Sequence, residues 1–280
     1  MKITVTGNGR SGSWKIRGDQ LGSALGARIV THATVQDFAK DDVIIVVKRV
    51  PTQLLHEVQR SGKKWVFDAL DFYPQPICSS WKRDEAIKWV KDHIAQYNPT
   101  AVVWPNRKMM EDCSDGRPSM VLYHHHRPGL QPRSVPERIA RIAYEGAKPY
   151  LGKWEHALKF WCHHFGWEFV VNPTSLSEVD AVVAFRDSGY AGYAQVNWKS
   201  DVKLANAKGA GIPFIGFPEH GYMERQCGGE FWVTSQSELK TAFSAIQHCE
   251  VRKDIQTVML ENKYSIEQAA ADLKEFIRGL

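Results

Sequence analysis

Two aspartates in the run FDALDFYPQP have the residue type and spacing for acid–base chemistry. Asp68 and Asp71 lie three positions apart, just beyond an apolar stretch with the composition of a buried strand. One carboxylate could accept a proton from a substrate hydroxyl while the other orients a sugar or a basic side chain. An aspartate in this place also commonly forms a turn or caps a helix, so the residues leave both interpretations open.

The stretch from Asn197 to Glu224, NWKSDVKLANAKGAGIPFIGFPEHGYME, could bind a diphosphate. Ser200 is placed to cap a helix whose first turns carry Lys199 and Lys203. Gly211 would end this helix. A helix start presents free N–H groups and the positive end of the dipole, and two ammonium groups add to its attraction for anions. A solvated basic helix followed by an ordinary crossover explains the same residues.

Polar residues follow two strand-like runs in the second half of the chain. The run PFIGF would deliver Glu219, Tyr222 and Glu224 to one edge of a sheet, where carboxylates could hold ribose or sugar hydroxyls. Arg186 stands at the end of the run DAVVAF, which makes it a candidate phosphate ligand. An ion pair between Arg186 and Asp187, or another nearby carboxylate, is equally consistent with the sequence.

Glycines and histidines supply two weaker signals. Gly7, Gly9 and Gly12 follow the first strand in a loose G-x-G-x-x-G pattern, and such a turn lets the backbone approach a ligand. Three histidines follow the last strand of the first half, and alternate side chains on an extended chain face opposite ways. Only His124 and His126 could therefore converge on a metal ion, and a role for one histidine in a cleft is the other functional interpretation.

The candidate residues above follow strand-like runs, so strands are expected to position them. Strand-like and helix-like segments alternate through both halves of the sequence. Most of the strand-like runs, such as DVIIVVK, KKWVFDAL and AVVWP, are solidly apolar. This pattern predicts an α/β protein whose parallel sheets are covered on both faces. Functional groups in such sheets collect at the carboxyl ends of strands. That rule selects Lys48, Arg49, Asp68, Asp71 and the histidines at 124–126.

Length and composition indicate two domains. The chain has 280 residues, of which 43% are hydrophobic, enough for two domains of about 130 residues with separate cores. The proline-rich run RPGLQPRSVP, from Arg127 to Pro136, predicts a linker. We therefore predict domains at 1–130 and 136–262, followed by a helix at 263–280.

The net charge and the cysteines indicate the kind of partner and the cellular compartment to expect. The net charge of +5 favours a polyanionic or phosphorylated partner. The five cysteines form no C-x-x-C pair, which indicates free thiols in a reducing compartment. The sequence shows no signal-peptide layout, and no apolar run approaches the roughly 18 residues of a membrane span. We expect a soluble cytoplasmic monomer with no membrane association.

One stretch resembles a known superfamily. Three short runs, Lys203-Leu-Ala-Asn-Ala207, Gly211-Ile-Pro213 and Pro218-Glu-x-Gly-Tyr-x-Glu224, resemble the donor-binding segment of GT-B glycosyltransferases. In that superfamily the segment is a helix and strand of the C-terminal Rossmann-like domain. Many retaining members carry two glutamates eight positions apart here, whereas this chain has Trp198 and Asn206 at the matching places. This departure does not change the fold that the resemblance implies, but it removes the carboxylate that would bind the ribose.

The resemblance implies two Rossmann-like domains facing each other across a cleft, with the last helix crossing back to the N-terminal domain. It implies transfer of a sugar from a nucleoside diphosphate donor, expected to be a UDP-sugar, to an acceptor hydroxyl with retention. The absence of a D-x-D motif agrees with a metal-independent enzyme. The expected catalytic residues are Asp68, Asp71, His124 and Arg17, although Arg17 could equally be a surface arginine. The expected donor-binding residues are Gly9, Ser13, Glu145, Gly146, Arg186, Lys199, Lys203, Asn206, Glu219, Tyr222 and Glu224.

The acceptor is the least constrained part of the prediction. Small size, basic charge and many Trp and Arg residues resemble the phage enzymes that glycosylate hydroxymethylated pyrimidines in double-stranded DNA, which would place the protein in the host cytoplasm. A bacterial transferase acting on a cell-surface glycan or small molecule is one alternative, and a non-catalytic nucleotide-sugar or DNA-binding module is another. The residues expected to meet DNA phosphates are Lys48, Arg49, Arg107, Lys108 and Arg127. The neighbourhood of Tyr73 or Trp104 could supply an aromatic or long side chain to fill the gap left by a flipped base.

Overall fold

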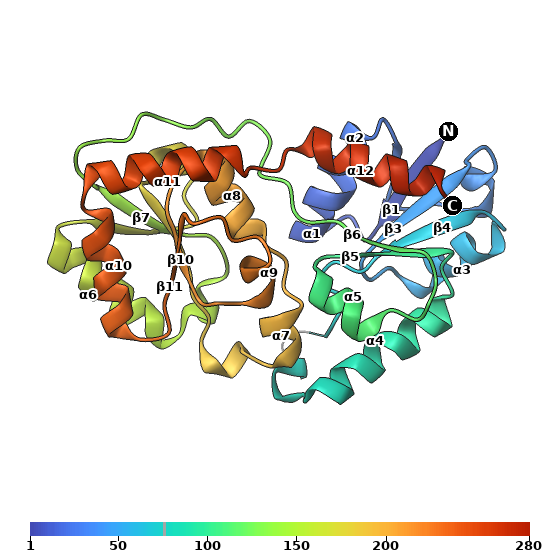
Figure 1. Cartoon of the computed structure of the whole chain (residues 1–280). Helices are drawn as coiled ribbons and strands as arrows, with labels where there is room; N and C mark the ends of the chain where they lie inside the picture. The colour runs from blue at the N-terminus through green and yellow to red at the C-terminus, as the bar shows by residue number, and fades with distance from the viewer. Residues whose placement is uncertain (75–76) are drawn as a thin grey trace. The chain divides into compact units, whose positions relative to one another are not determined.

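The computed structural model describes residues 1–74 and 77–280, with the side chains of residues 77 and 78 left out. The end of the FDALDFYPQP run and the thiol of Cys78 therefore lie outside the described part. The described chain divides into two compact units (Figure 1). Unit 1 comprises Met1–Tyr123, Asn197–Ser200 and Ile266–Leu280, and unit 2 comprises His124–Val196 and Asp201–Ser265.

Unit 1 is built on a six-stranded parallel sheet in the order β2-β1-β3-β4-β5-β6. In the register of this sheet, Gly7 pairs with Val47 and Val47 pairs with Asp68. The carboxyl ends of β1, β3 and β4 are therefore level, and the residues that follow them meet at one edge. The strands are β1 (Ile3–Gly7), β2 (Arg28–Val30), β3 (Val43–Val47), β4 (Lys64–Asp68), β5 (Ala101–Trp104) and β6 (Ser119–Val121).

Helices cover both faces of this sheet (Figure 1). The helical segment that follows β1 includes a π-helix, η1, over Lys15–Gln20. The last helix, α12, belongs to unit 1 and contacts α2. The other helical elements of unit 1 are α1 (Gly12–Trp14), α2 (Leu21–Ala24), η2 (Val35–Phe38), α3 (Thr52–Arg60), η3 (Ile77–Ser80), α4 (Arg83–Tyr97), α5 (Arg107–Cys113) and α12 (Ile266–Arg278).

Two glycines near the first strand make room for a core tryptophan. A Cβ atom at Gly7 or at Gly18 would lie 2.5 Å from carbons of the Trp14 indole, which is buried. Gly9 has φ +76°, and a Cβ there would lie 2.8 Å from Thr31 Cγ2. The glycine pattern that suggested close approach to a ligand is thus explained at Gly7 by the packing of Trp14.

Unit 2 is built on a five-stranded parallel sheet in the order β11-β10-β9-β7-β8. Its strands are β7 (Arg141–Tyr144), β8 (Glu168–Val171), β9 (Ala181–Ala184), β10 (Phe214–Gly216) and β11 (Glu230–Trp232). Its helical elements are η4 (Lys148–Leu151), α6 (Lys153–Phe165), η5 (Leu176–Glu178), η6 (Ser188–Tyr190), α7 (Tyr193–Asn197), α8 (Val202–Ala210), α9 (His220–Met223), α10 (Gln236–Ile246) and α11 (Cys249–Glu261). The last residue of α7, Asn197, is grouped with unit 1.

The two faces of the unit 2 sheet carry separate hydrophobic cores. Val183 of β9 packs with residues of α6 and α10, whereas its neighbour Val182 packs with residues of α8 and α11. Successive side chains of a strand point to opposite faces, so apolar strands without alternation need helices on both sides. The predicted class of two parallel-sheet α/β domains is confirmed.

The helix predicted to start at Ser200 begins later than expected. α8 starts at Val202 with Asp201 at its N-cap position, and the Asp201 carboxylate accepts a hydrogen bond from the backbone N–H of His124. The predicted Ser200 cap is therefore wrong, and Lys199 lies outside the helix. The predicted end is confirmed, because Gly211 occupies the C-cap with φ +65°.

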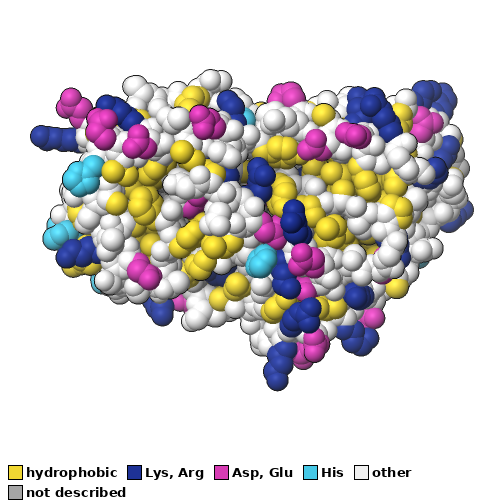
Figure 2. Space-filling view, in the orientation of Figure 1, with side chains coloured by type: hydrophobic (Ala, Val, Ile, Leu, Met, Phe, Trp, Pro, Cys, Tyr) yellow, Lys and Arg dark blue, Asp and Glu magenta, His cyan; other side chains and the backbone are white. Residues whose placement is uncertain are grey.

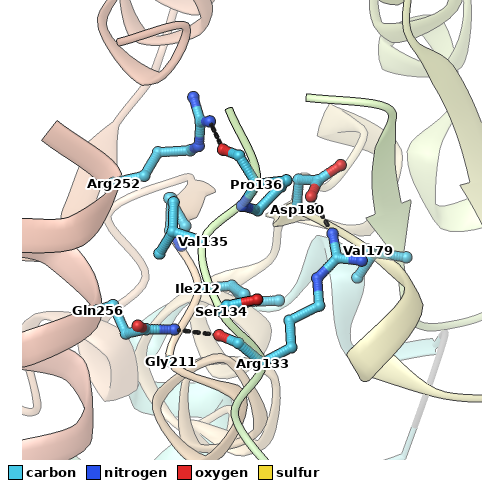
Figure 3. Close-up of a pocket in the computed structure, with 11 residues that line it drawn as sticks. Arg133, Ser134, Val135, Pro136, Val179, Asp180, Gly211, Ile212, Arg252 and Gln256 are labelled. Carbon is cyan, nitrogen blue, oxygen red and sulfur yellow. Dashed lines mark hydrogen bonds and ion pairs between the residues drawn. The ribbon is translucent and has the colours of Figure 1, made fainter. Parts of the chain in front are cut away.

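The proline-rich run 127–136 is held against unit 2 by side chains of α11 (Figure 3). Arg252 donates hydrogen bonds to the carbonyls of Pro136 and Glu137, and Gln256 donates to the Arg133 carbonyl at 2.8 Å. Arg133 in turn pairs with the buried Asp180. A pocket of only about 10 Å³ remains beneath the run, room for at most one water molecule. The run is thus a strap bound to unit 2.

No helix among the described residues is long and apolar enough to cross a membrane. Among the described side chains, Cys113, Cys162, Cys227 and Cys249 are free thiols. Burial raises the pKa of Cys113 and of Cys162 to about 12, so both stay protonated at neutral pH.

Candidate active site

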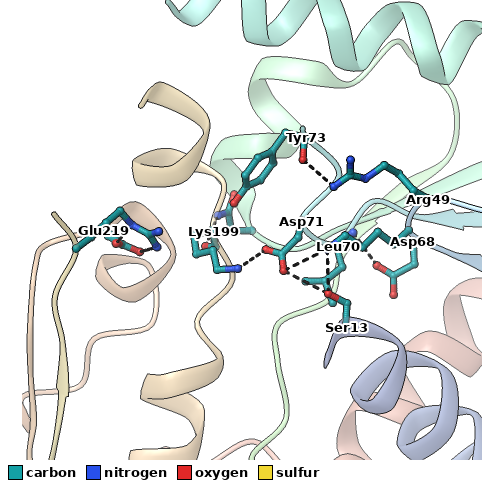
Figure 4. A network of polar contacts seen from close by, with 11 residues as sticks. Ser13, Arg49, Asp68, Leu70, Asp71, Tyr73, Lys199 and Glu219 are labelled. Carbon is teal, nitrogen blue, oxygen red and sulfur yellow. Dashed lines mark hydrogen bonds and ion pairs between the residues drawn. The ribbon is translucent and has the colours of Figure 1, made fainter. Parts of the chain in front are cut away.

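A polar cluster lies at the carboxyl edge of the unit 1 sheet (Figure 4). The Asp71 carboxylate follows β4, and its Oδ1 is 2.8 Å from Lys199 Nζ. Its other oxygen, Oδ2, is 3.8 Å from Lys48 Nζ and accepts a hydrogen bond from Ser13 Oγ at 3.3 Å. Lys48 also donates to Ser13 Oγ at 3.3 Å. Ser13 and Lys48 follow β1 and β3, between which the strand order reverses, and ligands bind at such points in open parallel sheets.

The backbone is strained at both ends of one ion pair in this cluster. Lys48 has φ +58° and Asp71 has φ +50°, values that residues other than glycine seldom adopt. Such conformations are unfavourable and gather at functional sites, where the surrounding structure enforces them. Burial lowers the pKa of the Lys48 ammonium; Asp71 opposes this shift, while the neighbouring cations Lys199 and Arg49 add to it.

The structure separates the two predicted aspartates. Asp68 is 2% exposed, and its Oδ1 accepts a hydrogen bond from the Leu70 backbone N–H at 3.1 Å. Burial raises the pKa of Asp68, and the Arg17 guanidinium, with Nε 3.7 Å from Oδ2, opposes that shift. The Asp71 side chain is 13% exposed and faces the cluster. Asp68 therefore has the turn-forming role that the sequence left open, and Asp71 is the accessible carboxylate.

Arg17 is not the surface arginine that the sequence allowed. It is 1% exposed, lies in the π-helix η1 and donates to the Leu122 carbonyl. Its Nε and Nη1 have no hydrogen-bond partner among the described residues. Arg17 therefore supports Asp68 from within the core, and its burial argues against contact with a substrate.

A second polar cluster follows the strands of unit 2. Arg186, after β9, donates from Nε to Glu219 Oε1 at 2.8 Å and from Nη2 to Oε2 at 3.4 Å. Both side chains are buried. The ion pair expected as an alternative is thus confirmed, with Glu219 as the partner, while Asp187 accepts a hydrogen bond from the Gly189 backbone N–H. The Arg186 charge is already largely compensated.

The end of β7 carries the rest of this cluster. Glu145 accepts hydrogen bonds from Arg127 and, at 3.0 Å, from Asn206 Nδ2 of α8. In the first turn of α8, Lys203 Nζ lies 4.5 Å above the centre of the Tyr144 ring, a cation–π arrangement. Burial raises the pKa of Tyr144 to about 12, so its hydroxyl stays neutral. The strand order reverses between β7 and β9, which places Glu145 and Arg186 at the reversal point of this sheet.

Gly146 follows Glu145 with φ +146°, a backbone conformation that favours glycine. Its N–H donates to Asn172 Oδ1 at 2.7 Å, and its carbonyl accepts from Asn172 Nδ2 at 3.0 Å. A Cβ atom at this position would lie 3.0 Å from the Tyr144 hydroxyl. Glycine therefore shapes the turn beside the cluster.

Two predicted ligands have other surroundings. Tyr222 is buried in the core and packs on Phe214 with ring centres 4.9 Å apart, and burial raises its pKa well above the usual value. Glu224 ends the short helix α9, with Oε1 3.8 Å from His220 Nε2. The Tyr222 ring is therefore part of the unit 2 core, while its hydroxyl interacts electrostatically with Glu219 and Arg186.

The histidine triplet belongs to unit 2. β6 ends at Val121, so the triplet does not directly follow the strand as expected. The side chains of His124 and His125 are buried. In the described residues, no group of three His, Cys, Asp or Glu side chains is arranged to hold a metal ion.

The residues expected to meet DNA have mixed surroundings. Lys108 pairs with the buried Asp112 at 3.0 Å, and Arg127 pairs with Glu145. Tyr73 and Trp104 are each 1% exposed, so neither ring lies at the surface of unit 1. On the face shown in Figure 2, each unit carries Lys and Arg side chains interspersed with Asp and Glu side chains.

A larger depression in unit 1, of about 710 Å³, lies at the opposite edge of the sheet. It is lined by Ile3, Arg28 and Asp37 and by Lys274 of α12. Ile3 and Arg28 are the first residues of β1 and β2. Since chemistry in parallel sheets collects at the carboxyl ends, we assign the site to the Asp71 edge.

The sequence reasoning missed the pairing of Asp71 with two lysines. Lys48 and Asp71 were both selected as strand-end residues, and the order of β3 and β4 would have joined them. Lys199 is 128 positions away from Asp71, and no local pattern connects the two residues.

Solved structures of similar architecture match nearly the whole chain. The Anabaena protein Alr3699/HepE, in complex with UDP and glucose, superposes over 100% of both chains with a TM-score of 0.70 at 10% sequence identity. AviGT4, a glycosyltransferase involved in avilamycin A biosynthesis, matches 100% of this chain and 98% of its own with a TM-score of 0.54 at 12% identity. An α1,3-fucosyltransferase matches 99% of this chain and 90% of its own, with a TM-score of 0.54 at 10% identity.

No protein-family model and no curated protein sequence matches the chain. At these low identities the structural likeness shows the fold alone. The chain has the two-domain α/β fold of GT-B glycosyltransferases, as predicted.

Proposed function

We propose that this protein is a glycosyltransferase, which moves a sugar from a nucleoside diphosphate donor to an acceptor hydroxyl. The observation that carries the proposal is the whole-length likeness of its fold to HepE in complex with UDP and glucose. The polar clusters at the reversal points of both sheets support it, because ligands of open parallel sheets bind there.

In this proposal unit 2 binds the donor, a UDP-sugar. Lys203 and the N–H groups at the start of α8 attract the diphosphate, while Glu145 and Asn206 offer polar atoms to the ribose or sugar hydroxyls. Each charge-assisted contact of this kind contributes roughly 1.5 to 3 kcal/mol. Arg186 adds less than the sequence suggested, because Glu219 compensates its charge.

Asp71 serves the acceptor hydroxyl in the same proposal, since it is the partly exposed carboxylate of the unit 1 cluster. From the family resemblance we propose retention of the anomeric configuration, no obligatory metal, and a cytoplasmic monomer. As the bond between the sugar and the diphosphate breaks and the bond to the acceptor oxygen forms, Asp71 accepts the proton of the acceptor hydroxyl and the nucleoside diphosphate leaves.

Replacing Lys203 with Ala should weaken the binding of UDP-glucose by about tenfold while the fold stays intact, because it removes one ammonium group from the diphosphate site. Isothermal titration calorimetry with UDP-glucose and with UDP measures this change. The matched control is Lys253→Ala, which removes an exposed lysine of α11 in the same unit. Equal affinity in a folded Lys203→Ala variant would remove Lys203 from the donor site.

For the acceptor we propose double-stranded DNA with hydroxymethylated pyrimidines. The net charge of +5 supports it, as do Lys48 and the exposed Arg49 beside Asp71. A glycan or small-molecule acceptor would not need these cations.

Binding to a hydroxymethylated duplex should weaken as salt rises, by roughly 0.9 log units per log unit of salt for each phosphate neutralised. Contacts from Lys48, Arg49 and Arg107 would give a slope of about −3. Fluorescence anisotropy across a salt series measures the slope, with turnover on the same duplex and on free sugars alongside. A flat salt response, or turnover on free sugars alone, would replace DNA with a glycan or small molecule.

A further inference from the structure

Four residues from the second half of the sequence, Asn197–Ser200, are part of unit 1. We infer that Trp198 and Asn106 are positioning residues that fix this segment so that Lys199 stays against Asp71. The inference rests on the proposed function and assigns Lys199 to the acceptor side of the reaction, whereas the sequence had suggested a diphosphate ligand.

Trp198 anchors the segment in the core of unit 1. Its side chain is completely buried, and its indole Nε1 donates to Asp112 Oδ2 at 3.0 Å. The other oxygen of Asp112 accepts from Arg83 at 2.8 Å and from Lys108 at 3.0 Å. The buried carboxylate is therefore compensated by two cations, and the indole N–H has a fixed acceptor. A buried aromatic ring with a satisfied polar end holds its backbone in one place.

Asn106 fixes the backbone on both sides of Trp198. Its Nδ2 donates to the carbonyl of Asn197 at 3.0 Å and to the carbonyl of Lys199 at 3.1 Å. Its Oδ1 accepts from the Met109 backbone N–H at 2.8 Å, so Asn106 also caps α5. The side chain is completely buried and uses both of its polar atoms. The Asn106 side chain thus binds three backbone groups, the carbonyls of Asn197 and Lys199 and the N–H of Met109.

Because these contacts fix the backbone of Lys199, only its side chain has to be ordered to reach Asp71. A long exposed lysine loses rotamer entropy when it is held in an ion pair, and this loss leaves most surface ion pairs weak. Here the backbone is already fixed, and Lys199 Nζ lies 2.8 Å from Asp71 Oδ1 with the lysine side chain 23% exposed. A cation at this distance favours the ionised carboxylate and fixes its orientation.

Asp71 faces charged and polar groups from several elements. Lys48 after β3 and Ser13 of α1 contact its Oδ2, and Lys199 contacts its Oδ1. Asp68, the last residue of β4, interacts electrostatically with Asp71. Lys48 remains when Lys199 is removed, so the carboxylate keeps one cation. The effect of Lys199 on the titration of Asp71 is therefore measurable without leaving the carboxylate isolated.

The test compares Lys199→Met, which keeps the length of the side chain, with Lys199→Arg, which keeps its charge. In ¹³C NMR titrations, with the Asp71 carboxyl assigned from the Asp71→Asn spectrum, the midpoint should rise by about one pH unit in Lys199→Met. In Lys199→Arg the midpoint should rise by no more than about a third of a pH unit, because arginine keeps the positive charge. The acidic limb of the pH–rate profile should move with it, and the affinity for UDP-glucose should change by less than about twofold.

Two further variants test the anchors without removing the lysine. Trp198→Phe keeps a ring and loses the indole donor, and Asn106→Asp keeps the cap of α5 and loses both amide donors. Each should move the titration midpoint upward by less than Lys199→Met does. Trp232→Phe, a half-buried tryptophan of β11, is the matched control and should leave the midpoint unchanged.

An unchanged midpoint in Lys199→Met would overturn the tuning of Asp71 by Lys199. An unchanged midpoint in both folded anchor variants would overturn the positioning roles of Trp198 and Asn106. The titration needs no turnover, so a midpoint that moves in a protein without transferase activity would reject the proposed function and keep this inference.

Discussion

Replacing Asp71 with Asn is expected to lower turnover by about a hundredfold or more while the affinity for UDP-glucose stays within about twofold. General acid–base groups contribute on the order of 10² to 10⁴ in rate, and the amide keeps the shape of the carboxylate but loses its basicity. Asp71 is the partly exposed carboxylate of the cluster with Ser13, Lys48 and Lys199. Steady-state rates with a saturating donor, together with calorimetry, separate the two effects.

The control for this substitution is Asp92→Asn, an exposed aspartate of α4 that pairs with Lys88. Its turnover should equal that of the unaltered protein. Turnover within about threefold of normal in a folded Asp71→Asn variant would contradict the acceptor role. Asp71 would then be a residue that only holds Lys48 and Lys199 in place.

Replacing Arg17 with Met is expected to lower the free energy of unfolding by about 3 to 5 kcal/mol, because it leaves the buried Asp68 without its cation. Arg17 and Asp68 are 1% and 2% exposed, and Arg17 Nε lies 3.7 Å from Asp68 Oδ2. Urea unfolding followed by circular dichroism measures the change. The matched control is Arg60→Met, whose exposed pair with Glu57 should be worth at most about 1 kcal/mol.

The loss in Arg17→Met should grow with pH. Burial raises the pKa of Asp68 in the folded state above its unfolded value, so the folded state binds this proton more tightly. The stabilising contribution is then complete below the unfolded pKa and is lost as pH rises through the folded pKa. Without Arg17 the folded pKa rises further and the loss is larger. A difference between variant and unaltered protein that is small and equal at pH 5 and pH 8 would contradict this account.

The alternation of apolar strands and helices predicted both sheets. A short, continuous apolar run is typical of a strand that is buried on both faces of a parallel sheet. The rule that functional groups collect at the carboxyl ends of strands selected Lys48 and Asp71. The two residues lie close together because β3 and β4 are neighbouring strands with level ends. These predictions depended only on local periodicity and on sheet geometry.

The sequence could not predict contacts made by single side chains over long separations. The Ser200 cap failed because Trp198 and the amide of Asn106 hold residues 197–200 in unit 1, so α8 starts after them. The prolines of the run 127–136 predicted a linker, and no pattern in the run indicates that Arg252 binds the Pro136 carbonyl. Gly7 matched a ligand-binding pattern, although its missing Cβ makes room for Trp14.

The central claim is that this fold transfers a sugar from a nucleotide donor. The most direct measurement is incubation of the protein with UDP- and GDP-sugars and either hydroxymethylated DNA, plain DNA or free sugars, followed by mass spectrometry of the nucleosides and sugars. The account predicts the mass of an added sugar on one acceptor, with release of the nucleoside diphosphate, and loss of both products in Asp71→Asn. Donors left intact with every acceptor, by a protein that binds them in calorimetry, would contradict the claim and indicate a binding module without catalysis.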